Sequence, residues 1–181
     1  MPSPSTPDQP GHEDLSDVLG DIEIPDDLSS LTDARQDPEL AVLITQVAEA
    51  EPLAAACVLA GLDVDVVPTP VGALGVLRDT SGDLPNRAAA AVSQLVAGVP
   101  LVLVTRHGEQ LTCVRYTDGA DDGELPPGLV LGGAPDALED LLTGHLTLAD
   151  LPGVVSSSGI SRLKAVRMLS QVARKGRKKK R

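Results

Sequence analysis

Apolar and polar residues change their spacing within residues 99–116, and this change predicts a β-hairpin. Residues 101–104 form a continuous apolar run, which is typical of a strand covered on both faces. In residues 111–116 the side chains are expected to face the two sides of a sheet in turn. Between the two runs, His107 and Gly108 suit a tight turn, because glycine tolerates a positive φ. We expect the rest of residues 38–155 to fold onto the sheet that this hairpin begins.

The residues before the hairpin predict alternating strands and helices. The apolar, partly β-branched run at 40–45 favours a strand, although Pro38 could instead start a helix there. A helix over 51–60 is apolar on nearly every side, and Gly61 is a suitable C-cap. Strands are expected at 63–67 and 72–78, and a helix between Asp83 and Gly98.

This order fits a split β-α-β-β-α-β unit with an extra edge strand. We therefore predict an α+β fold: a small two-layer mixed β-sheet with its helices on one face. After the hairpin, the sequence predicts an acidic loop at 118–128, a short edge strand at 129–131, a helix at 135–143, at most one helical turn at 148–151, and a hinge at 156–159.

The N-terminal part, residues 1–37, is predicted to be a disordered acidic tail with one short amphipathic segment. Within residues 13–31, apolar side chains recur at i, i+3, i+4 and i+7, as on one face of a helix. Such a short segment gains stability by docking this face in a groove, and we weigh docking equally with disorder. The candidate partner-binding residues are Leu15, Val18, Leu19 and Ile22.

The C-terminal part, residues 156–181, is predicted to be a hinge followed by a basic amphipathic helix with a cationic end. Its apolar stripe consists of Leu163, Val166, Leu169 and Ala173. The basic residues that we expect to contact nucleic acid or another polyanion are Lys164, Arg167, Arg174, Lys175, Arg177, Lys178, Lys179, Lys180 and Arg181.

The charge distribution makes this segment stand out. The net charge is −11, yet residues 161–181 carry ten bases and no acid, whereas residues 1–40 carry eleven acids and one base. The single Tyr and the absence of Trp and Phe argue against base stacking and aromatic cages. We expect Cys57 and Cys113 to be buried thiols, and we expect no metal site or cofactor. We find no signal peptide or membrane span, and we expect a cytoplasmic protein.

One short motif suggests chemistry. Residues Arg106-His107-Gly108-Glu109 follow an apolar strand and resemble the Arg-His-Gly-Glu signature of the histidine phosphatase family. The resemblance implies that His107 would take a phosphoryl group and that Arg106 would hold its oxygens. The family places the motif near its N-terminus and follows it with a helix. Here a strand is expected to follow, so we favour a hairpin turn.

The sequence therefore predicts a non-enzymatic binding or adaptor protein with no catalytic residues. In this hypothesis the basic tail contacts phosphates of nucleic acid or of a ribonucleoprotein. One alternative is a protein–protein interaction module that acts through residues 13–31 and the α+β domain. A more remote alternative is a phosphoester enzyme at His107.

Overall fold

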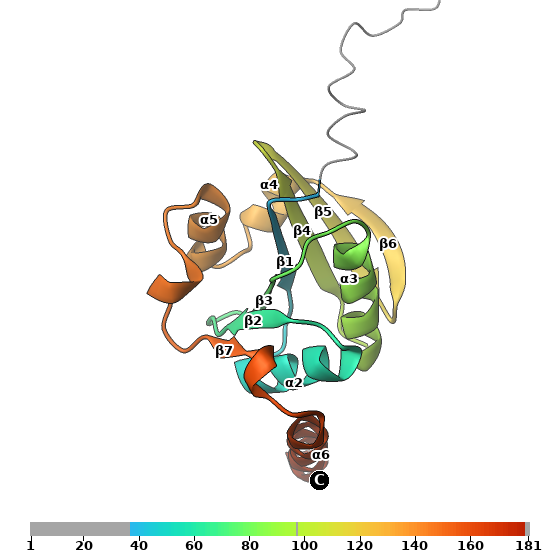
Figure 1. The fold of residues 1–181 in the computed structure, drawn as a ribbon. Helices are drawn as coiled ribbons and strands as arrows, with labels where there is room; N and C mark the ends of the chain where they lie inside the picture. The colour runs from blue at the N-terminus through green and yellow to red at the C-terminus, as the bar shows by residue number, and fades with distance from the viewer. Residues whose placement is uncertain (1–36, 97, 180–181) are drawn as a thin grey trace, which may run out of the picture. The chain divides into compact units, whose positions relative to one another are not determined.

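A computed structural model describes residues 37–96 and 98–179, with side chains up to Gln171 (Figure 1). The described strands are β1 (Leu40–Ile44), β2 (Val64–Val67), β3 (Leu74–Leu77), β4 (Leu101–His107), β5 (Gln110–Thr117), β6 (Ala120–Leu125) and β7 (Val155–Ser156). The helices are α2 (Ala50–Ala60), α3 (Leu84–Leu95), α4 (Pro127–Leu131), α5 (Asp136–Thr143) and α6 (Arg162–Lys179), with 3-10 turns η2 (Leu148–Asp150) and η3 (Ser157–Gly159).

The strands of the described residues form one sheet in the order β6-β5-β4-β1-β3-β2-β7. Its central part, β4-β1-β3-β2 with α2 and α3 as crossovers, is the predicted split β-α-β-β-α-β unit, and the α+β class is confirmed. Two details of the prediction are wrong. The sheet has seven strands and is larger than the small sheet that was predicted. Every pair of neighbouring strands is antiparallel, so the sheet is not mixed.

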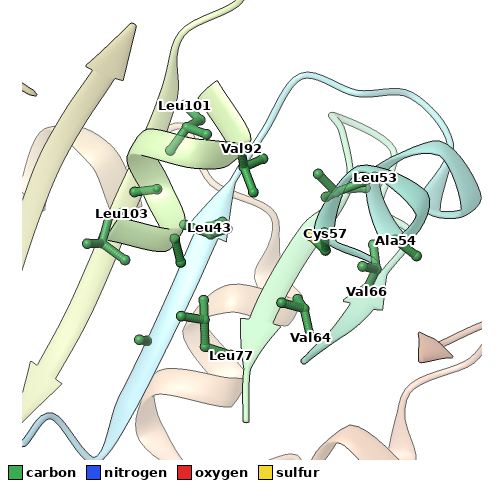
Figure 2. Packing of buried hydrophobic residues seen from close by; sticks show 14 of the residues in the cluster. Leu43, Leu53, Ala54, Cys57, Val64, Val66, Leu77, Val92, Leu101 and Leu103 are labelled. Atoms are coloured by element: carbon green, nitrogen blue, oxygen red, sulfur yellow. The ribbon is translucent and has the colours of Figure 1, made fainter. Parts of the chain in front are cut away.

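The first face of the sheet is covered by α2 and α3. Alternate residues of each strand point to this face, so that Leu43 packs here while its neighbour Val42 points to the other side. Figure 2 shows Leu43 and Leu103 of the sheet together with Leu53 and Cys57 of α2. Apart from Cys57, the core is built from aliphatic side chains and one tyrosine, Tyr116, as the composition requires.

The second face is covered as well, which corrects the prediction that the helices lie on one face. Val42, Val76 and Val104 are buried on this side and pack in one cluster with Leu138 of α5. Arg106 fixes α5 to the sheet, because its Nη1 donates a hydrogen bond of 2.5 Å to the Leu142 carbonyl. The apolar residues on this face of the strands require such a cover, since they would otherwise be exposed to water.

Two other predicted segments are also corrected. Residues 120–125 form the edge strand β6 within the predicted acidic loop, because Asp118 and Gly119 adopt positive φ angles and turn the chain back along β5. The strand expected at 129–131 is instead part of α4. Pro127 begins this helix, at a position where a missing N–H costs little.

The segment predicted as a hinge, residues 156–159, forms the end of β7 and the turn η3. Ser157 is buried, and the Val64 amide donates a hydrogen bond of 2.8 Å to its hydroxyl oxygen. These contacts join the segment to β2. The amphipathic N-terminal segment lies outside the described residues. Among the helices that are described, none combines the length and the apolar character needed to cross a membrane.

Candidate functional site

Helix α6 begins against the globular core and is held there by its first two turns. Ser161 precedes the helix, and its hydroxyl accepts a hydrogen bond from the Lys164 amide, as a capping residue does. Ala165 has no exposed surface and lies where α6 packs against α2. Arg162 donates a hydrogen bond of 3.4 Å to the Leu59 carbonyl near the end of α2. The start of α6 therefore has a fixed orientation relative to α2.

This orientation leaves the basic side of α6 in solvent. Lys164 and Arg167 are exposed, and neither forms an ion pair with an acid among the described residues. Gln171 follows them on the same exposed side. The structure thus brings together two of the residues predicted to bind a polyanion. The helical backbone continues through Arg174, Lys175, Arg177, Lys178 and Lys179, but the side chains of these residues are not described. Lys180 and Arg181 lie outside the described residues.

The predicted apolar stripe of α6 is divided by its packing. Leu169 is partly buried, but Leu163 is 71% exposed and Val166 is 49% exposed. The residues on the packed side are Ala165, Met168 and Leu169. A single neighbouring helix covers only part of the circumference of α6, so Leu163 and Val166 stay in solvent.

The Arg-His-Gly-Glu motif occupies the end of β4 and the tight turn into β5, which confirms the predicted hairpin. The turn lies one residue later than predicted, because His107 is the last residue of β4 and pairs with Gln110. Arg106 and His107 are consecutive strand residues, so their side chains point to opposite faces of the sheet. The Arg106 guanidinium is already engaged by the Leu142 carbonyl and by Glu39, whose carboxylate lies 2.9 Å from Nη2. The two side chains therefore do not converge on a common phosphate position.

Sequence reasoning missed a polar cluster at the other end of the sheet. The Arg78 guanidinium forms two hydrogen bonds, of 2.7 and 2.8 Å, with the nearly buried carboxylate of Asp65 and also reaches Ser156. The hydrogen bond from Arg78 lowers the pKa of Asp65 below its ordinary value, against the effect of burial. The sequence does contain a signal for this cluster, because Asp65 interrupts the apolar run of β2. The cluster joins β2, β3 and β7, and its polar groups satisfy one another.

The remaining candidate chemistry is sparse in the described part of the chain. Burial raises the pKa of the Cys57 thiol to about 12, so this cysteine is not a thiolate nucleophile near neutral pH. No three His, Cys, Asp or Glu side chains of the described residues lie close enough together to hold a metal ion. Two surface cavities of about 340 Å³ each share Val71 and Pro135, and Asp136 is the single titratable residue that lines either one.

The comparisons with known proteins add no relative: no family, curated protein or solved structure matches the chain.

Proposed function

We propose that the protein is a non-enzymatic binding protein whose helix α6 presents cations to the phosphates of nucleic acid or of a ribonucleoprotein. The observation that supports this function is the anchored start of α6. The buried Ala165 and the Arg162–Leu59 hydrogen bond hold the helix so that Lys164 and Arg167 face solvent. The bases that follow continue in the same segment, without an acid among them.

The charge of the rest of the protein gives this segment its role. Residues 41–160 contain fifteen acids and four arginines, so the body repels a polyanion while the C-terminal segment attracts it. Contact is then directed to α6 and the residues after it. Because the segment lacks aromatic residues, we expect binding through phosphates, with strong salt dependence and little sequence preference.

Within the described residues, the sheet offers no competing surface of the kind used by open-sheet RNA-binding domains, which stack bases on exposed aromatic residues. Both faces of the described sheet carry helices, and the Tyr116 side chain is buried in the first core. The Tyr116 hydroxyl donates a hydrogen bond to Asn86, which further occupies its polar end. This arrangement favours an electrostatic interaction at α6.

The proposal is tested by comparing Arg167→Gln with Arg87→Gln in binding to a generic DNA duplex. Both arginines are exposed helical residues, and both changes remove one positive charge, but Arg87 lies on α3 in the acidic body. We expect Arg167→Gln to weaken binding and to lower the slope of log affinity against log salt by about 1. Arg87→Gln should bind like the unmodified chain.

A deletion of residues 174–181 should have a larger effect of the same kind and should nearly flatten the salt dependence. If the deletion leaves duplex and single-strand binding at low salt unchanged, the proposed function is wrong. It is equally wrong if Arg167→Gln and Arg87→Gln reduce binding to the same extent, because the net charge alone would then account for the effect.

A further inference from the structure

Helix α6 also has exposed apolar side chains, which contact with phosphates does not use and which share only Arg167, at one border, with the basic side. We call the side chains of Leu163 and Val166 the α6 apolar strip. They are 71% and 49% exposed, although α2 covers the neighbouring side of the same helix through Ala165. A single exposed apolar side chain is ordinary, but these two are three positions apart and therefore adjacent on one helical face.

The strip is bordered by arginines on both sides. Arg162 precedes Val166 by four residues and Leu163 precedes Arg167 by four, so each apolar side chain has a cationic neighbour on the helix surface. Arg162 is exposed even though it reaches the Leu59 carbonyl. The surface thus combines a narrow apolar line with positive charge along both edges.

This pattern is complementary to an amphipathic helix with an apolar stripe and acidic flanks. We propose that the α6 apolar strip docks such a helix from a partner protein, with the arginines pairing with its carboxylates. Helix recognition commonly uses apolar anchors at i and i+3, and Leu163 and Val166 have this spacing. This inference goes beyond the proposed function and does not depend on it.

The charge of the body argues against an anionic membrane as the occupant. A lipid surface is broad, and it would bring the acidic residues of the body toward anionic headgroups. The strip also lacks the aromatic residues that anchor interfacial helices. A second copy of α6 is disfavoured because pairing two such strips would place arginines against arginines. An acidic helix avoids the repulsion between the body and anionic headgroups, because it is much narrower than a lipid surface. It also avoids the repulsion between arginines.

The test uses the full-length chain and a fluorescent acidic peptide of about 18 glutamate and leucine residues, with leucines at i, i+3, i+4 and i+7. A peptide with the same composition in scrambled order removes the stripe but keeps the charge. The test variant is Leu163→Gln/Val166→Gln. The matched control is Val71→Gln/Leu129→Gln, which replaces two apolar side chains of similar exposure, 60% and 69%, elsewhere on the body.

We expect the striped peptide to bind more tightly than the scrambled one, and the test variant to weaken this binding by roughly tenfold or more. The control variant should bind the striped peptide normally. The test variant should also keep its affinity for duplex DNA, so a failure here is distinguishable from a failure of the proposed function, which is read from Arg167→Gln.

Several outcomes would overturn the docking proposal. Equal binding of the two peptides would mean that charge alone is recognised. If the striped peptide does not bind, an acidic amphipathic helix is not the partner. Loss of self-association in the test variant by sedimentation would assign the strip to a second copy. Loss of binding to vesicles of mixed neutral and anionic phospholipid, with the peptide unaffected, would assign it to a membrane.

Discussion

Replacing Leu138 with alanine probes the second layer of the fold, which decides whether the sheet is available as a binding surface. Leu138 has no exposed surface and lies between α5 and the strands, with Val42 and Val104 in its cluster. The substitution removes three carbon atoms, worth about 2.4 kcal/mol at about 0.8 kcal/mol for each buried CH₂ group. The cavity that remains adds to this, and we expect a loss of about 3 kcal/mol in the free energy of unfolding.

The two cysteines allow each face of the sheet to be followed separately. Cys113 belongs to the Leu138 cluster, whereas Cys57 lies on α2 in the first core (Figure 2). Both thiols are nearly or fully buried, so labelling by a thiol reagent requires the protein to open. The free energy of unfolding is measured by urea denaturation, and the site of labelling is identified by peptide mass spectrometry.

We expect Leu138→Ala to speed the labelling of Cys113 by roughly a hundredfold, which corresponds to about 3 kcal/mol. Leu53→Ala, a change of equal size in the α2 core, should speed the labelling of Cys57 and leave local opening at Cys113 unchanged. Leu129→Ala, on the exposed surface of α4, should change stability by less than about 0.5 kcal/mol. A loss below about 1 kcal/mol for Leu138→Ala, with no change at Cys113, would refute the docking of α5 on this face.

Two further predictions concern the positions that hold the sheet together. Asp65→Asn should destabilise the protein above about pH 4, because Arg78 lowers the pKa of Asp65 in the folded state. This contribution is lost as the pH falls through the folded pKa of Asp65. The difference in free energy of unfolding between the variant and the parent, measured by urea denaturation, should therefore shrink on acidification. A difference that grows would contradict the prediction. Gly72→Ala should cost about 3 kcal/mol or more in thermal unfolding, because φ is +141° and a Cβ would lie 2.0 Å from the Thr45 carbonyl oxygen. The matched change Gly128→Ala, in open space on α4, should be neutral or slightly stabilising, and equal effects of the two would contradict the reasoning.

The central fold was predictable because its signals are local. Apolar runs bounded by turn residues located β1 and the β4–β5 hairpin, and Gly61 ends α2 in the left-handed conformation that a C-cap glycine adopts. The tight turn was predicted at His107 and Gly108 from the same kind of signal, but it lies one residue later, at Gly108 and Glu109, because His107 pairs with Gln110. Such features depend on a few neighbouring residues, and their physical cause is present in the sequence itself.

The misplaced elements depend on contacts that are distant in the sequence. Strand β6 contains Asp121, Asp122 and Glu124, residue types that are depleted in strands, and it exists through its ladder with β5. The sequence predicted the helix at 135–143, which contains α5, but not the face of the sheet that it covers. Ser157 looked like part of a polar hinge, yet its hydroxyl is buried against β2.

The candidate site shows the same limit within one helix. The apolar and basic sides of α6 could be read from their period of 3.6 residues, but α2 divides the apolar side in a way that no periodicity reveals. Ala165, a small residue that is not part of the predicted stripe, is the buried contact, whereas Leu163 within the stripe is 71% exposed. A small residue permits close approach of the two helix backbones, and Leu163, two positions before Ala165, then lies on the far side of α6. That close contact is therefore what leaves Leu163 and Val166 available to a partner.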